Sequence, residues 1–204
     1  MSAQLQSPPL SFEELLSNEN ASPVRHEYIG GRLYAMAGGT PNHADIGTNI
    51  AVAVQSRLRG KSCRGSSSDQ RVRTSQTATN WYYPDFLIKC PPYQFHPRDK
   101  NALLNPRAIF EVLSPETENF DRTGKFDEYK TIEELTDYVL VDTQRARVEH
   151  FLKSQNGEWT QRVYTLLEQE LRLENFEISV PLSEIYEDVE VGAQGVLPAM
   201  EMAQ

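Results

Sequence analysis

The chain has 204 residues and a mass of 23.2 kDa, which is the size of one domain with short appendages. Its 39% hydrophobic and 24% charged residues are typical of a globular protein and exclude a disordered one. An apolar run such as Ile50 to Val54 is far too short to span a bilayer, and the N-terminus lacks the pattern of a secretory signal. The net charge of −9 excludes a protein coated in nucleic acid. We expect a cytoplasmic protein without a membrane segment.

Two cysteines, Cys63 and Cys90, are present, and they lack CxxC spacing. This count excludes a disulfide framework and a cysteine-rich zinc site. We expect a flexible N-terminus over residues 1–10 and one domain over 11–188. A mobile tail is expected over 189–204, which holds two glycines and a proline.

The N-terminal part of the chain predicts a helix, a hairpin and a second helix. Ser11 and Glu14 have the spacing of a capping box at the start of a short helix. Residues 26–36 predict two strands joined by a pair of glycines. Asn42 or Asp45 is the expected cap of the next helix. The apolar stripe of that helix recurs every four residues and consists of Ile46, Ile50, Val54 and Leu58.

The rest of the chain alternates between strand and helix signals. Three candidate strands lie at residues 69–74, 81–90 and 107–114. Residues 91–105 are rich in proline and predict an excursion loop. Asp121 is the expected cap of a helix that runs to Ile132, and residues 137–143 predict a buried strand, followed by antiparallel strands. This order predicts an α/β (α+β) fold with a mixed central sheet flanked by helices.

Two carboxylates stand where buried strands should carry none. In the strand RAIFEVLS, both faces are apolar except for Glu111. Asp85 repeats the pattern directly after Pro84, which marks a bend or an edge. Buried carboxylates are paired, hydrogen-bonded or bound to a metal. On adjacent strands the two would form an oxygen site suited to Mg²⁺ or Mn²⁺, whereas an edge-exposed or salt-bridged Glu111 and a turn-exit Asp85 are the alternatives.

Lys125 is the third candidate. It lies one helical turn before Tyr129, so a helix packed on the strand of Glu111 would direct the ammonium over the carboxylates. The alternative is a solvated lysine paired with Glu118 or Glu128.

One segment is basic within an acidic chain, and it predicts contacts with nucleic-acid phosphates. Its cations are Arg57, Arg59, Lys61, Arg64, Arg71 and Arg73. A solvated helix end and loop is the alternative explanation.

Four motifs in order, PDFLIK, AIFEVLSPET, DRTGKFDEYK and DYVLVDT, resemble the Uma-two family of restriction-endonuclease-like proteins. This family is a branch of the PD-(D/E)XK nuclease superfamily. The opening HEYIGGRLYAMAGGTPNHADI is also similar to the family's hairpin and helix, so the resemblance covers residues 11–187. It implies an αβββαβ core with additional antiparallel strands.

The resemblance also implies roles for residues. Asp85 takes the place of the PD aspartate, Glu111 that of the (D/E)XK acid, and the carbonyl of Val112 would be a further metal ligand. A metal-dependent hydrolase of DNA phosphodiester bonds follows, with Mg²⁺ or Mn²⁺ as cofactor and no organic cofactor. A homodimer is expected if both strands of a duplex are cut.

The lysine departs from the superfamily pattern. Leu113 stands where the superfamily has its lysine, and Lys125 matches a lysine displaced to the following helix, with Lys130 as the second candidate. Glu27 matches a recurrent acid of the family's hairpin, and it is either a fourth active-site group or only a charge of the hairpin. Leu113 and the acidic net charge favour the alternative, a catalytically silent module that binds nucleic acid or protein.

Overall fold

The computed structural model describes residues 10–36 and 39–192. The expected flexible N-terminus and mobile tail lie almost entirely outside these ranges. No helix in the described ranges is long and apolar enough to cross a membrane.

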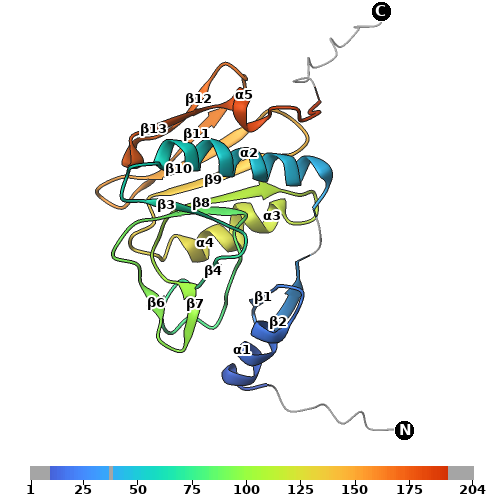
Figure 1. The fold of residues 1–204 in the computed structure, drawn as a ribbon, viewed down its shortest axis with the longest axis vertical. Helices are drawn as coiled ribbons and strands as arrows, with labels where there is room; N and C mark the ends of the chain where they lie inside the picture. The colour runs from blue at the N-terminus through green and yellow to red at the C-terminus, as the bar shows by residue number, and fades with distance from the viewer. Residues whose placement is uncertain (1–9, 37–38, 193–204) are drawn as a thin grey trace, which may run out of the picture.

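A six-stranded mixed sheet forms the centre of the molecule (Figure 1), with strand order β11-β10-β9-β8-β5-β3. Its strands are β3 (Arg64–Ser67), β5 (Phe86–Lys89), β8 (Pro106–Leu113), β9 (Asp137–Asp142), β10 (Val148–Lys153) and β11 (Trp159–Tyr164). β8 and β9 are parallel, and the other neighbours are antiparallel. The predicted fold class is confirmed.

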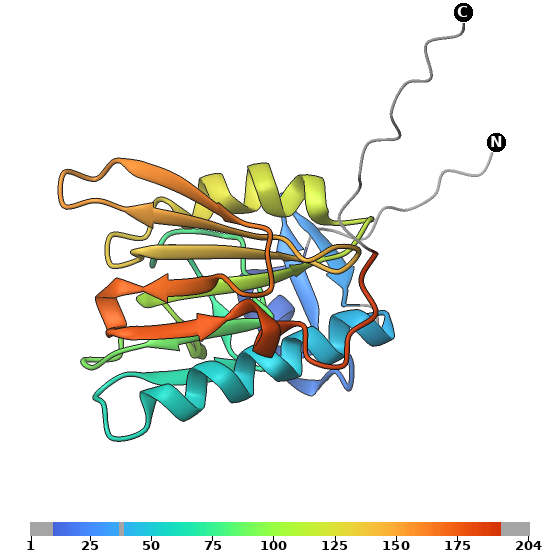
Figure 2. The ribbon, with the colours of Figure 1, turned by 90° about the horizontal axis from the view of Figure 1, so that it is seen from above.

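Helices cover both faces of the sheet (Figure 2). Helix α2 (Pro41–Leu58) lies on one face, together with the hairpin β12 (Glu170–Leu173) and β13 (Ile178–Pro181) and the short α5 (Leu182–Ile185). The other face carries α3 (Glu118–Phe120), the π-helical turn η1 (Asp121–Lys125) and α4 (Phe126–Tyr129). The alternation predicted for β8 is confirmed, because Phe110 packs on the α2 side and Ile109 on the α4 side.

Helix α2 begins before both of its predicted caps, with Thr40 as the cap, two residues before Asn42 and five before Asp45. Thr40 accepts a hydrogen bond from the backbone N–H of His43, and Pro41 occupies the first helical position. Asn42 and Asp45 therefore lie inside the helix and do not cap it. The predicted stripe of the helix is confirmed as buried and consists of Ile46, Ile50, Val54 and Leu58.

The N-terminal elements form a separate layer below the sheet in Figure 1. They are α1 (Phe12–Ala21), with the predicted capping box, and the antiparallel hairpin β1 (His26–Ile29) and β2 (Arg32–Ala35). Gly30 and Gly31 have positive φ values of 56° and 86°, as a tight turn between two strands requires.

Two predicted segments differ from the structure. Residues 69–74 contain only β4 (Arg71–Val72), which lies outside the central sheet, and residues 91–105 contain β6 (Phe95–His96) and β7 (Asp99–Leu103) instead of a plain loop. β4 and β7 pair in parallel. Such a long-range pairing leaves no local pattern in the sequence.

The two cysteines correct another prediction, because Cys63 and Cys90 form a disulfide. β3 and β5 are antiparallel with Arg64 opposite Lys89, so the next positions along this register are the two cysteines. Their spacing in the sequence gave no sign of the pairing.

Replacing both cysteines with serine should lower the free energy of unfolding in oxidising buffer. The disulfide closes a loop with a sequence separation of 27 residues, and chain entropy for such a loop corresponds to about 3 kcal/mol. Urea denaturation with and without reductant measures the difference, and the two proteins should converge when reductant is present. Equal stability in oxidising buffer would contradict the prediction.

Candidate functional site

The site lies where the carboxyl end of β8 passes the start of β5. The last paired residue of β5 is Phe86, opposite Phe110, so Val112 extends beyond β5. The backbone N–H of Val112 donates instead to Oδ2 of Asp85, at 2.7 Å. The carboxylate of Asp85 thus accepts the hydrogen bond that a carbonyl of a neighbouring strand would otherwise accept.

Lys125 points into the protein and contacts three carboxylates. Its Nζ lies 3.1 Å from Oε1 of Glu27, 3.2 Å from Oε1 of Glu111 and 3.4 Å from Oδ1 of Asp121. These acids come from β1, β8 and η1, and only 7% of the lysine side chain is exposed. The structure therefore places Lys125 over the carboxylates and not in solvent beside Glu118 or Glu128.

Burial and neighbouring charges change how this cluster titrates. Burial raises the pKa of Glu111 well above its usual range, Lys125 opposes that rise, and the nearby acids Asp121, Asp85 and Glu27 add to it. Burial disfavours the ammonium of Lys125, but the attraction of Glu111 and the other acids outweighs it and raises the lysine pKa well above normal. Lys125 is therefore held in its charged form.

The other candidate lysine does not reach the cluster. Lys130 pairs with Asp127 at 2.6 Å on the surface, and its ammonium lies over the ring of Phe126. Tyr129, in contrast, donates a hydrogen bond of 3.3 Å to Oε1 of Glu111. Of the two lysines, only Lys125 meets the carboxylates.

Glu27 is fixed by the hairpin that carries it. Its Oε1 also accepts the backbone N–H of Tyr83 at 3.0 Å. Asn80 holds the hairpin against α4, since it accepts from the N–H of Gly30 at 3.0 Å and donates to Oε1 of Glu128 at 2.6 Å. The sequence gave no signal for Asn80, because its partners lie far away along the chain.

His43 is a site residue that the sequence analysis did not single out. Its Nε2 lies 3.5 Å from Oδ2 of Asp85. The hydrogen bond to Asp85, and a further one to the backbone of Val112, raise the pKa of the imidazole above its ordinary value of 6.5. The histidines show no metal-ligand spacing along the sequence, whereas the partner of His43 is 42 residues away.

The basic segment does not form one surface. Arg71 and Arg73 are buried, and Arg57 and Lys61 form ion pairs with Glu184 and Glu177. Arg57 lies fourteen residues after His43 on α2, which corresponds to roughly 20 Å along the helix axis. Arg59 and Arg64 remain as exposed cations of this segment; Arg59 directly follows α2, and Arg64 is the first residue of β3.

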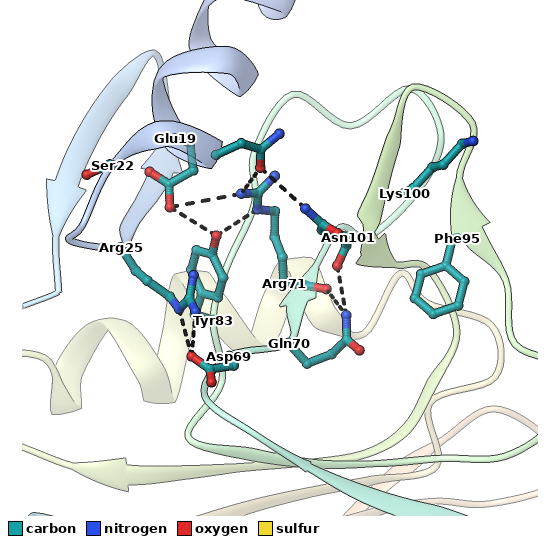
Figure 3. Close-up of a pocket in the computed structure, with 11 residues that line it drawn as sticks. Glu19, Ser22, Arg25, Asp69, Gln70, Arg71, Tyr83, Phe95, Lys100 and Asn101 are labelled. Carbon is teal, nitrogen blue, oxygen red and sulfur yellow. Dashed lines mark hydrogen bonds and ion pairs between the residues drawn. The ribbon is translucent and has the colours of Figure 1, made fainter.

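Arg71 belongs to a buried polar network (Figure 3). Its guanidinium contacts Asp99 at 2.8 Å and donates to the hydroxyl of Tyr83 at 2.8 Å, and that hydroxyl donates to Glu19. Arg73 donates to the carbonyl of Ala78. Both arginines were predicted to contact phosphates, but both are buried inside the protein. Nε and Nη1 of Arg73 have no hydrogen-bond partner among the described residues, and its guanidinium lies over the ring of Phe12.

The donors at the sheet edge suit a hydrated magnesium ion. Mg²⁺ prefers oxygen ligands and is bound by one or two protein carboxylates while it keeps several waters. Asp85, Glu111 and the backbone of Val112 supply such oxygens at this edge. Within residues 10–36 and 39–192, no three side chains of the His, Cys, Asp or Glu type are grouped so that they could hold a metal. An ion at this edge would therefore be held by few protein groups and by water, as is usual for Mg²⁺.

Comparisons with known proteins agree with this architecture. The model of the Uma2 family, described as "Putative restriction endonuclease", matches residues 11–183. Two uncharacterized proteins of Synechocystis sp., slr1290 and sll1609, are 33% and 30% identical over 88% and 86% of this chain and 92% and 95% of their own lengths. The crystal structure of a putative nuclease belonging to DUF820 from Anabaena variabilis superposes with a TM-score of 0.69, at 16% identity, over 87% of this chain and 98% of that one. The fold is that of this solved structure.

Replacing Lys125 with methionine should destabilise the protein by about 3 kcal/mol, because it leaves buried carboxylates without their cation. Lys130→Met is the matched control, since its exposed pair contributes less than about 1 kcal/mol. Urea denaturation at neutral pH compares the two variants. If Lys125→Met were as stable as Lys130→Met, the ionic cluster would not hold these elements together.

The contribution of His43 to stability should depend on pH. Its pKa is raised in the folded state, so its stabilising effect is complete below the ordinary value of 6.5 and is lost as pH rises through the folded value. Wild type should therefore exceed His43→Asn in free energy of unfolding more at pH about 5.5 than at about 8.5. Denaturation at both values tests this, and an NMR titration reads the imidazole directly. A pH-independent difference would contradict it.

Proposed function

The chain belongs to the Uma2 family, and from this premise we propose that it is a metal-dependent endonuclease that hydrolyses phosphodiester bonds in DNA. The observation that carries the proposal is the contact of Lys125 with the buried Glu111, next to the backbone position, Val112, whose N–H donates to Asp85. Two carboxylates and one buried ammonium provide what phosphodiester hydrolysis requires: a place for a divalent cation and a fixed positive charge.

Asp85, Glu111 and the carbonyl of Val112 are the groups that we propose to hold Mg²⁺ or Mn²⁺. A divalent ion bound there lowers the pKa of a water molecule and acts as a Lewis acid on the phosphate. The two carboxylates differ in their exposure to solvent. Asp85 is 18% exposed and open to ions from solution, whereas Glu111 is buried behind it.

Lys125 is the proposed cation of the transition state. Its contacts with Glu27, Glu111 and Asp121 fix the ammonium in place before substrate arrives. A preorganised charge needs no reorganisation during the reaction, which is why such groups contribute strongly to catalysis. In this proposal Lys125 orients the water and neutralises charge on the phosphoryl oxygens, and Glu27 positions the lysine.

The residue at the position where the superfamily has its lysine cannot supply the positive charge here. Leu113 is buried in the apolar cluster on the α4 side of the sheet, together with Tyr129 and Phe126. The ammonium of Lys125 reaches Glu111 from η1 instead. This supports the proposal that the lysine has been displaced to the helix.

The proposal also includes contacts with DNA and a dimeric assembly. Arg59 and Arg64 are exposed and are the remaining candidates for contacts with DNA phosphates. A homodimer would cut both strands of a duplex with two symmetric sites. We propose a cytoplasmic enzyme without an organic cofactor.

One observation favours a second candidate, a catalytically silent module that binds nucleic acid or protein. Lys125 already contacts three acids, so the ionic cluster is satisfied without substrate or metal. Buried ion pairs of this kind serve as structural elements in proteins without catalysis. The two candidates differ in whether the protein binds a divalent cation through Asp85.

A plasmid assay separates these candidates. Supercoiled plasmid and single-stranded DNA are incubated with Mg²⁺ or Mn²⁺ and wild type, Asp85→Asn, Glu111→Gln or Asp69→Asn. The last is the control, because Asp69 pairs with Arg25 on the surface away from the site. Metal-dependent nicking is expected from wild type and the control, and its loss from the other two.

Lys125→Ala should lower turnover roughly 100- to 1000-fold and spare the affinity for metal. Equal nicking by wild type and Asp85→Asn would refute the site. No nicking of any substrate together with no binding of Mn²⁺ would establish the silent module as the better description.

A further inference from the structure

We propose that His43 is a ligand of the divalent metal, so that an imidazole nitrogen joins Asp85 and the carbonyl of Val112 in the coordination shell. This inference rests on the proposed function. It adds a nitrogen donor, from α2, to a site for which the sequence motifs name only oxygen donors.

The geometry places the imidazole beside the most accessible carboxylate. Nε2 of His43 lies 3.5 Å from Oδ2 of Asp85. Two neighbouring ligands, each about 2.1 Å from one ion, lie roughly 3 to 3.5 Å apart, depending on the angle between them. The two side chains therefore already have the separation of ligands that share an ion.

The backbone of Val112 is the third member of this group. It donates its N–H to Asp85 at 2.7 Å and also hydrogen-bonds to His43. The N–H and the C=O of one strand residue point to the same side of the strand, so the Val112 carbonyl also faces the side of β5, beyond its first residue Phe86. Asp85, His43 and this carbonyl therefore converge at one end of the sheet.

The position of His43 is built into the start of α2. Its backbone N–H donates to the side chain of Thr40, which fixes the first turn of the helix. Gly39 leaves room for the ring, because a Cβ at this position would lie only 2.7 Å from Cγ and Nδ1 of His43. The close approach of backbone and imidazole favours one orientation of the ring.

Glu111 is the least accessible of the proposed side-chain ligands. Its Oε1 accepts from Tyr129 at 3.3 Å and contacts Lys125 at 3.2 Å, and the side chain is almost fully buried. His43 and Asp85, in contrast, are 24% and 18% exposed. An ion arriving from solution thus meets the pair of His43 and Asp85 before it meets Glu111.

A nitrogen ligand has a chemical consequence. Oxygen-only sites suit Mg²⁺, whereas imidazole suits transition metals and follows the usual order of increasing affinity from Mn²⁺ to Co²⁺. The site should therefore bind Mn²⁺ more tightly than Mg²⁺, and replacement of His43 should reduce this preference.

Pulsed EPR on the full chain loaded with Mn²⁺ tests the proposal without an activity assay. Wild type should show a nitrogen coupling to Mn²⁺, and labelling the protein with ¹⁵N-histidine should change that signal, which distinguishes imidazole from backbone nitrogen. His43→Gln should lose the coupling and bind Mn²⁺ roughly 10- to 100-fold more weakly. His26→Gln is the matched control, because His26 is similarly exposed and pairs with Glu19 at 3.0 Å.

The outcomes separate this inference from the proposed function. Binding of Mn²⁺ that depends on Asp85 but shows no histidine coupling would overturn the role of His43 and leave the metal site standing. No binding of Mn²⁺ by wild type would overturn both. If His43→Gln fails to fold, as circular dichroism would reveal, the isotope experiment on wild type still decides the question.

Discussion

The buried ammonium of Lys125 is the contact on which the arrangement of this protein depends. It joins three segments that are distant in sequence: the hairpin through Glu27, the central strand through Glu111 and the π-helical turn through Asp121. Each of these charges alone would be costly inside the protein, so none is stable there without the others. The ionic cluster therefore fixes the hairpin and the helix relative to the sheet.

A second constraint comes from the backbone at the edge of the sheet. β5 begins only at Phe86, opposite Phe110, so Val112 still requires hydrogen-bond partners on that side. Asp85 and His43 supply them from a turn and from a helix. The side chains that we propose to act in function are thus also the ones that complete the hydrogen bonding of the sheet edge. A bound cation at this edge would replace contacts that the protein already makes with its own side chains.

Local patterns in the sequence predicted individual helices and strands. They could not predict contacts between residues that lie far apart in the sequence. The alternation in β8 and the stripe of α2 depend on neighbouring residues, and both are confirmed. The disulfide of Cys63 and the buried network of Arg71 depend on strands brought together by the fold. The same distinction applies to the site. Helical spacing made Lys125 a candidate beside the alternative of a solvated lysine, and the family resemblance implied its role. His43, in contrast, approaches Asp85 only through the packing of α2 on the sheet.

The net charge of the site limits which ligands it can bind. Burial raises the pKa of Glu111 most, and the like charges of Asp121, Asp85 and Glu27 raise it further against the attraction of Lys125. Lys125 is the ammonium that contacts Glu27, Glu111 and Asp121, and the exposed cations of the basic segment, Arg59 and Arg64, lie beyond the last residue of α2. A phosphodiester, itself an anion, would meet net repulsion at such a site. Added positive charge is therefore a requirement for binding a nucleic-acid backbone here, and the proposed divalent ion supplies it where the protein does not.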